Sequence, residues 1–196
     1  MTGLDDPARK ASQAQSTRIH GVVSLDRIAD MTKADLTELG ELSVAVPDSS
    51  ADWPGRALEW AVAEWCARAR DDNRRLTSVT GVVLRQGTRD GQPALIGGIG
   101  GVKTHPAARR QGYAATTLRR AVEFLYEQAD VAFGLLVCEP HMIAYYSRLG
   151  WREFGGRLLV RSFGLTAEFA VARVMTRDIG LAGPTTGTID ICGPPW

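Results

Sequence analysis

The sequence predicts a single α/β domain of the α+β type, built on a mixed, mostly antiparallel sheet with helices on both faces. The chain has 196 residues, 44% of them hydrophobic, which is enough to bury a core without disulfides or metals. Three strand-like runs follow one another with only turn sequences between them, a pattern typical of consecutive hairpins. A strand, a basic glycine-containing loop, a helix, a strand and a helix then follow in that order.

Charge and composition exclude several classes of protein. The formal net charge is +1, so a nucleic-acid-binding surface is not indicated and any anion site must be local. The three cysteines are far apart and form no C-x-x-C pair, which indicates reduced thiols and no metal site. No apolar run approaches the roughly 20 residues that span a bilayer, and the start lacks an apolar signal sequence. We therefore expect a cytoplasmic protein without nucleic-acid or membrane partners.

The chain is expected to begin with an arm and then a β-α unit. Residues 1–17 are polar and without periodicity, so we predict a disordered arm followed by one domain over residues 18–196. A short strand is predicted over residues 21–25. Leucines at helical spacing predict a helix over residues 32–44, with Thr32 as its N-cap.

A loop and a meander come next. Turn residues predict a loop over residues 47–54, which brings two acids and a tryptophan together on an irregular segment. Turn sequences follow at residues 71–74 and at Asp90-Gly91, and we read the runs that they separate as antiparallel strands. The predicted strands cover residues 64–70, 76–86 and 94–104.

The best helix in the sequence covers residues 112–128, because apolar side chains form one stripe and charged ones lie off it. A buried strand is predicted over residues 132–138. A short helix over residues 142–149 should stop at Gly150. The remainder, residues 158–196, alternates strand-like runs with Gly-Pro turns.

The joint between the 94–104 strand and the following helix has the features of an anion site. A loop that enters a helix presents unpaired N–H groups and the positive end of the helix dipole. Gly112 and Ala114 keep this backbone accessible, while Arg109, Arg110 and nearby Arg119 add positive charge. A pyrophosphate fits such a loop. By itself the pattern also suits a helix that merely begins with glycine and exposed arginines.

The pattern Arg109-x-x-Gly112-x-Ala114, between an apolar strand and an amphipathic helix, resembles the acetyl-CoA signature of GNAT acetyltransferases. Tyr146, followed by Gly150-Trp151, is similar to the closing element of that family, and the match spans residues 76–151. The resemblance implies a GNAT fold in which the sheet is splayed between the 94–104 and 132–138 strands to hold acetyl-CoA. The cofactor-binding residues that it implies are Val102, Lys103, Thr104, Arg109, Arg110, Gln111, Gly112, Tyr113, Ala114 and Ala115.

Within the family, the sequence resembles the aminoglycoside 2'-N-acetyltransferases. The similarity rests on an acidic loop with tryptophan, on Tyr146 with its glycine-aromatic pair, and on a C-terminal tryptophan. It implies acidic groups, including the carboxylate of the last residue, that bind a cationic sugar. The implied substrate-binding residues are Asp48, Asp52, Trp53, Glu139 and Trp196. Two alternatives stay open: the aspartates cap turns, and Trp196 is a hydrophobic plug that closes the core.

Acyl transfer needs an acid for the departing thiolate and a route for the amine proton. Tyr146 is the predicted acid, since a phenol with a pKa of about 10 stays protonated at neutral pH; Tyr145 is expected to point elsewhere. Gly100 stands where the aminoglycoside enzymes carry a glutamate, so Glu139 and His141 are the candidate bases, with a water chain as the alternative.

The run from residue 97 to residue 101 holds four glycines, which are unusual in a strand. A pantetheine arm lying along the strand would explain them, and a β-bulge suits the same observation.

The sequence therefore predicts an acetyl-CoA-dependent N-acetyltransferase acting on a primary amine of a small cationic molecule. An aminoglycoside-type antibiotic is the first candidate, kasugamycin-like compounds included, with resistance as the outcome. Acetylation of another small amine or a protein N-terminus is the enzymatic alternative. The other alternative is a module that senses acetyl-CoA without turnover. A nucleotide-binding Rossmann protein is disfavoured because no leading β-α unit carries G-x-G-x-x-G. Dimerisation through the C-terminal strands stays open.

Overall fold

The computed structural model describes residues 21–46 and 54–196. The predicted arm, residues 1–17, lies outside them. The strands are β1 Val23–Arg27, β2 Trp65–Arg70, β3 Leu76–Arg89, β4 Gln92–Thr104, β5 Val131–Cys138, β6 Arg152–Glu153, β7 Arg157–Ser162, β8 Leu165–Glu168, β9 Arg173–Asp178 and β10 Thr188–Asp190. The helices are α1 Lys33–Ala45, α2 Tyr113–Glu127 and α3 Ile143–Ser147. Short 3₁₀ turns lie at Ile28–Asp30, Pro54–Ala57, Pro106–Ala108 and Pro140–Met142.

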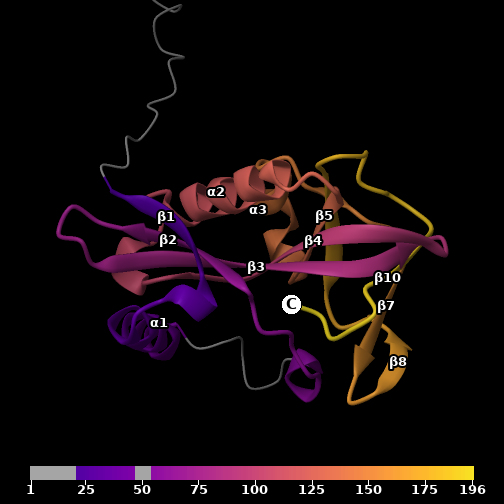
Figure 1. Cartoon of the computed structure of the whole chain (residues 1–196), viewed down its shortest axis with the longest axis horizontal. Coiled ribbons are helices and arrows are strands. Elements are labelled where there is room, and N and C mark those ends of the chain that lie inside the picture. Colours follow the sequence, from indigo (N-terminus) through magenta and orange to yellow (C-terminus); the bar gives the residue numbers. More distant parts are fainter. Residues whose placement is uncertain (1–20, 47–53) are drawn as a thin grey trace, which may run out of the picture.

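Within the described residues the strands form one mixed sheet, in the order β6-β9-β5-β4-β3-β10-β7-β8, with β2 paired to β3 and β1 paired to β2 (Figure 1). The pairings β4 with β5 and β10 with β7 are parallel, and the others are antiparallel. The long strand β3 pairs with β4 along its length, with β2 near its start and with β10 near its end. The predicted mixed, mostly antiparallel sheet is confirmed.

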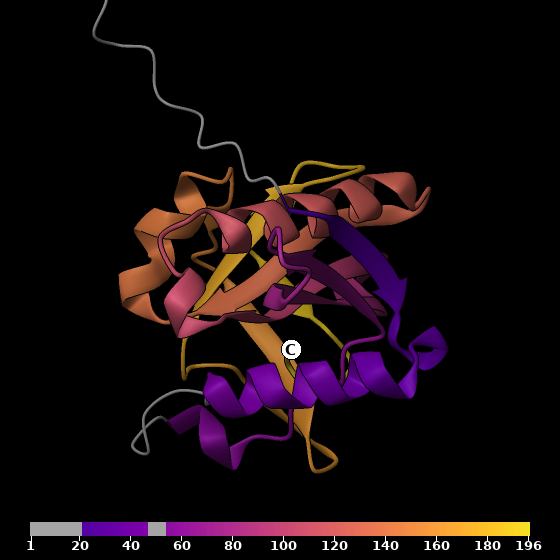
Figure 2. The ribbon, with the colours of Figure 1, turned by 90° about the vertical axis from the view of Figure 1, so that its left-hand side faces the viewer.

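The predicted helices are confirmed with small changes at their ends, and α1 and α2 lie on opposite faces of the sheet (Figure 2). Thr32 caps α1 as expected: its hydroxyl accepts a bond from the Asp35 N–H, and the Asp35 carboxylate accepts one from the Thr32 N–H. The chain turns after α3 at Gly150, which has φ +85°.

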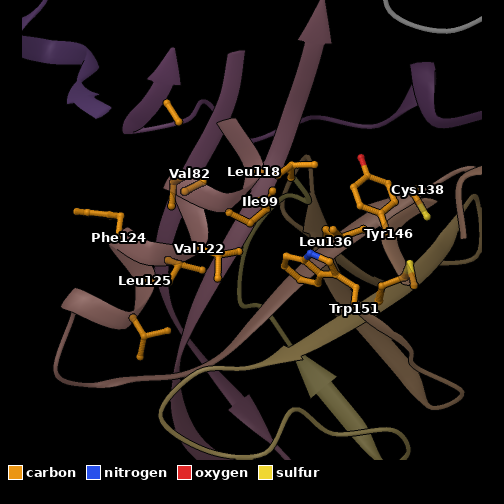
Figure 3. Packing of buried hydrophobic residues seen from close by; sticks show 14 residues of the cluster. Val82, Ile99, Leu118, Val122, Phe124, Leu125, Leu136, Cys138, Tyr146 and Trp151 are labelled. Carbon is orange, nitrogen blue, oxygen red and sulfur yellow. The ribbon is translucent and has the colours of Figure 1, made fainter. Parts of the chain in front are cut away.

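The apolar stripe of α2 packs against the sheet as its helical spacing predicts. Leu118, Ala121, Val122 and Leu125 are all buried. The cluster that they join continues to the buried residues Tyr146 and Trp151 (Figure 3). A second cluster includes Phe133, Leu158 and Ile189, and it holds the ring of Trp196. No helix in the described part of the chain is long and apolar enough to cross a membrane.

Candidate active site

The sheet opens where β4 and β5 part. Their parallel pairing runs from Leu95 opposite Val131 to Ile99 opposite Leu136 and goes no further, although both strands continue. On the other side of β4, the register with β3 shifts between Val79 and Gly81. The predicted splay is therefore confirmed, and the last residues of β4 turn backbone groups toward an open space instead of toward β5.

The loop before α2 is built for an anion. Gly112 is the N-cap of α2 with φ +91°, and no side chain of the part of the chain that the structure describes caps the helix start. Arg110 also has a positive φ, +60°, which is uncommon for a residue with a side chain. Two left-handed residues within three positions fold the loop tightly in front of the helix, so free N–H groups and the helix dipole meet there.

A cleft of about 1330 Å³ lies over this loop and the splayed end of β4. Nine of the ten predicted cofactor-binding residues line it: Val102, Lys103, Thr104, Arg109, Arg110, Gly112, Tyr113, Ala114 and Ala115. Gln111 does not line the cleft. It is exposed, and its side-chain amide donates to the Ala107 carbonyl at 2.9 Å. The combination of bare backbone, two arginines and a large cleft fits a cosubstrate with a pyrophosphate and a long neutral arm.

Tyr146 lies in the wall of the same cleft, on α3. The residue is only 7% exposed, and its phenol oxygen points away from the apolar side chains around it (Figure 3). Burial raises the pKa of the phenol well above its ordinary value, and the nearby Cys138 and Tyr145 add to this shift. The hydroxyl therefore keeps its proton at every physiological pH.

Tyr145 does not point elsewhere, so that expectation is wrong. It lines the same cleft, and its ring centroid is 5.2 Å from that of Tyr146. Adjacent residues point in different directions on a helix, but α3 is barely more than one turn, and the cleft reaches both tyrosines. Within the described residues, the buried Tyr145 hydroxyl has no hydrogen-bond partner.

Glu139 and His141 also reach the cleft, directly after β5. Their carboxylate and Nδ1 lie 3.4 Å apart, with 45% and 71% of the side chains exposed. The structure thus brings both predicted base candidates to the mouth of the cleft, beside the wall that carries Tyr146. Asp48, Asp52 and Trp53, the predicted acidic loop, lie outside the described residues.

The indole of Trp196 packs against β4. The indole N–H donates to the Leu135 carbonyl at 3.1 Å, and the Arg85 guanidinium lies 5.1 Å from the ring centroid. The ring fills the position that a side chain at Gly98 would need, since a Cβ there would lie 2.1 Å from the indole. The ring thus closes the core as a plug, and the residue also lines the cleft.

The glycines of β4 consequently have another cause than the one we expected. A Cβ at Gly100 would lie 2.6 Å from the main-chain carbonyl carbon of Trp196, and a Cβ at Gly97 would meet Leu125. Both, like Gly98, make room for the protein's own packing and not for a pantetheine arm. Gly101 has open space and φ +57°, and it lies at the bulge. No side chain at position 100 could occupy this site with Trp196 in place, so the glutamate of the aminoglycoside enzymes has no counterpart there.

Sequence reasoning missed one wall of the cleft. Trp60 lines it, packed edge to face against Phe169 with 6.3 Å between ring centroids. The neighbouring Ala61 N–H donates to the Pro195 carbonyl at 2.6 Å, which joins this wall to the C-terminal segment. No periodic pattern surrounds Trp60, and although its indole N–H donates to the nearby Gly55 carbonyl at 2.8 Å, its aromatic partner Phe169 is far away in the sequence, so the sequence pattern did not reveal it.

The comparisons with known proteins agree with this geometry. A model of the acetyltransferase (GNAT) domain matches residues 54–154, about half of the chain. The fold is similar to a GNAT family N-acetyltransferase (YhbS) from Escherichia coli solved in complex with CoA, at 15% identity and TM-score 0.57, covering 87% of this chain and 89% of that one. It is also similar to Escherichia coli ElaA, at 13% identity and TM-score 0.58, covering 81% and 99%.

An acyl-CoA N-acyltransferase from Pseudomonas aeruginosa is similar at 20% identity and TM-score 0.54, covering 80% of this chain and 99% of that one. At these identities the likeness is one of fold. A comparison with curated proteins finds no match.

Proposed function

The chain belongs to the GNAT family of acetyltransferases and is an acyltransferase with acetyl-CoA as cosubstrate, and on this premise we propose that it acetylates a primary amine of a small cationic molecule. Aminoglycoside-type antibiotics, kasugamycin-like compounds among them, are the first candidates. Resistance to such a compound would be the consequence. A cytoplasmic location belongs to the same proposal, because free cysteines such as Cys66 and Cys138 are typical of reducing compartments.

In this proposal the chain holds its cosubstrate mainly through main-chain groups. The N–H groups around Gly112 and the α2 dipole bind the pyrophosphate, and Arg109 and Arg110 add charge. The unpaired edge of β4 at Val102 and Thr104 offers backbone donors and acceptors to the pantetheine arm. Acetyl-CoA supplies an acetyl group already activated as a thioester.

Tyr146 is the proposed acid. Its hydroxyl holds a proton at neutral pH because burial raises its pKa, and its oxygen is turned out of the apolar cluster. A proton at this oxygen can pass to the sulfur of the leaving thiolate. The position of the hydroxyl in the cleft wall is the single observation that carries a catalytic function, as opposed to binding alone.

Glu139 and His141 are the proposed partners of the acceptor amine. The carboxylate attracts a cationic amine to the mouth of the cleft, and either side chain can accept the proton that the amine loses. Trp60 supplies flat apolar surface beside them, which suits the faces of sugar rings, and Trp196 lines the same cleft. Asp48, Asp52 and Trp53 complete the proposed acceptor site from the loop outside the described residues.

Thiol release from acetyl-CoA tests this function with a panel of aminoglycosides including kasugamycin, alongside polyamines and short peptides. We expect turnover with the sugar antibiotics and a raised acceptor KM in Glu139→Gln. Glu153→Gln is the matched control, because Glu153 is another exposed carboxylate that forms an ion pair with Arg173 but does not line the cleft.

Turnover of peptides alone would redirect the proposal to protein N-termini. Binding of acetyl-CoA without turnover on any amine would contradict catalysis and favour the sensor.

A further inference from the structure

A group of buried hydroxyls lies beneath residues 109–115, the cofactor loop with the first residues of α2, inside an otherwise apolar layer. Ser78 and Thr80 on β3 and Thr117 on α2 are each 0% exposed. They sit beside Val82 and Leu118, which are equally buried. Buried hydroxyls are costly unless they are hydrogen-bonded, so the partners of these groups decide what they do.

One half of the group ties β3 to the first turn of α2. The Thr80 hydroxyl donates to Thr117 Oγ1 at 2.9 Å, and Thr117 Oγ1 in turn donates to the Ala114 carbonyl at 3.1 Å. Ala114 belongs to the cofactor loop and lines the cleft. A strand in the core is thus connected through two side chains to the backbone that faces the cosubstrate.

The other half ties β3 to the splayed end of β4. The Ser78 hydroxyl donates to the Lys103 carbonyl at 2.9 Å, and it lies 2.8 Å from Thr104 Oγ1. Ser78 Oγ and Thr117 Oγ1 are 3.5 Å apart, so the two halves meet. With Thr104 as the donor to Ser78, each of the four hydroxyl protons has one acceptor, which makes the group a fully satisfied network.

The network spans the place where the sheet geometry is irregular. The β3–β4 register shifts between Val79 and Gly81, next to Thr80, and β5 no longer supports β4 here. The cleft wall at Lys103 and Thr104 pairs with β3 at Val79 and Ser78, whereas the wall at Ala114 belongs to a helix and has no strand ladder to β3 or β4. Side-chain hydrogen bonds from below join them instead.

We propose that Ser78, Thr80 and Thr117 are positioning residues for acetyl-CoA, which set the separation and orientation of the two main-chain walls that bind it. Recognition through main-chain groups depends on where the backbone stands, and a rigid support must fix that position. A hydroxyl network fixes it better than apolar packing, because hydrogen bonds are directional.

The test is direct binding of CoA by calorimetry, with melting temperatures measured for the same samples. Thr117→Val keeps the shape of the side chain but removes the central donor and acceptor. We expect the Kd for CoA to rise about tenfold. Thr117→Ser keeps the hydroxyl and should restore the Kd to within about twofold of the wild type. Once an acceptor amine is identified, Thr117→Val should raise the KM for acetyl-CoA and leave the KM for the acceptor unchanged.

Thr77→Val is the matched control. Thr77 is also a buried threonine of β3, but its hydroxyl donates to the Ala69 carbonyl at 2.9 Å, away from both walls. Its loss should lower the melting temperature and leave CoA binding unchanged. Equal CoA affinities in Thr77→Val and Thr117→Val would overturn the proposal and leave the network a purely structural role.

A double variant, Thr80→Val with Thr117→Val, separates the effect on stability from the effect on the position of the backbone that binds CoA. Removing both partners leaves no unsatisfied hydroxyl between them, so the melting temperature should recover relative to Thr117→Val. The CoA affinity should stay low, since the bond to Ala114 is still missing; full recovery would contradict the proposal. If Thr117→Val does not fold, Ser78→Ala tests the Lys103 side in the same way. CoA binding needs no acceptor, so these outcomes are independent of the proposed substrate.

Discussion

Two adjacent tyrosines, Tyr145 and Tyr146, lie in one wall of the cleft, and single substitutions can test which of them is the acid. Tyr146→Phe removes the proposed acid while keeping the buried ring, so we expect kcat to fall about 100-fold with little change in the KM for acetyl-CoA. Burial raises the pKa of this phenol, so the protonated form persists as pH rises. The wild-type rate should therefore show no loss from Tyr146 near pH 10, the ordinary tyrosine value. Thiol release across a pH series measures both effects.

Tyr145→Phe is the control for that experiment. Its hydroxyl is buried and has no hydrogen-bond partner among residues 21–46 and 54–196, and removing an unsatisfied polar atom should be neutral or slightly stabilising. We expect activity within about twofold of the wild type. A loss of activity in Tyr145→Phe but not in Tyr146→Phe would show that Tyr145 is the acid and contradict the assignment to Tyr146.

A substitution at Gly98 tests how tightly the indole of Trp196 packs on β4. A Cβ at this position would lie 2.1 Å from the indole, which is itself held by a hydrogen bond to Leu135 and cannot yield easily. We expect Gly98→Ala to lower the free energy of unfolding by about 1–3 kcal/mol, as overpacking does. Urea denaturation measures this. Gly40→Ala in α1 is the opposite case: nothing lies within 4 Å of its Cβ, so helix propensity alone should raise stability by about 0.5–1 kcal/mol.

At the scale of elements, the cofactor loop depends on backbone conformation more than on side chains. Gly112 has φ +91°, so Gly112→Ala places a side chain in left-handed backbone at a cost of about 1–2 kcal/mol and should weaken CoA binding about tenfold. Arg110→Gly relaxes the same conformation at φ +60° but removes a charge. We expect it to weaken binding less at high salt than at low salt, measured by calorimetry. A larger loss of CoA affinity in Arg110→Gly than in Gly112→Ala, at both salt concentrations, would show that the charge of Arg110 matters more than the backbone conformation.

The elements with a regular hydrophobic period were predictable from the sequence. The stripe on α2 and the cap at Thr32 are local signals, and both predictions are confirmed because nothing distant overrides them. Local turn chemistry likewise identified the meander of β2, β3 and β4. The GNAT fold was implied by the resemblance of two motifs, Arg109-x-x-Gly112-x-Ala114 and Tyr146 with Gly150-Trp151, and the family match supports it.

The candidate site was predictable only where it consists of consecutive residues. The loop from Arg109 to Ala115 is one motif, whereas the seat of Trp196 on Gly98 and Gly100 joins segments nearly a hundred positions apart. Glycine has no side chain to reveal whether a ligand or the protein's own chain approaches it, so that pattern permitted two interpretations. Ser78 and Thr80 are ordinary strand residues by propensity, and only three-dimensional contacts set them apart.

At the scale of the whole molecule, ion pairs join the first β-α unit to the sheet that carries the site. Arg68 of β2 pairs with Asp26 of β1 and Asp35 of α1, and Arg70 pairs with Glu38. The Arg68 side chain is only 10% exposed, so these carboxylates offset the cost of burying its charge. The network crosses three elements, which makes it a property of the assembled domain and not of any one of them.

Acid should therefore destabilise the domain over a defined range of pH. Bonds from the Thr32 hydroxyl and from Arg68 lower the pKa of Asp35 to about 2, and Arg70 lowers the pKa of Glu38. A carboxyl group whose folded pKa is depressed contributes stability above its unfolded pKa of about 4 and loses it as pH falls toward the folded value. We expect the urea midpoint to be steady from neutral pH to about pH 5 and to fall steeply between about pH 4 and 2. Asp35→Asn should start from a lower midpoint and fall less steeply, because asparagine does not titrate. Parallel curves for the two proteins would place the acid-sensitive groups elsewhere, with Asp178, whose pKa Arg152 lowers to about 2, as the next carboxylate to replace.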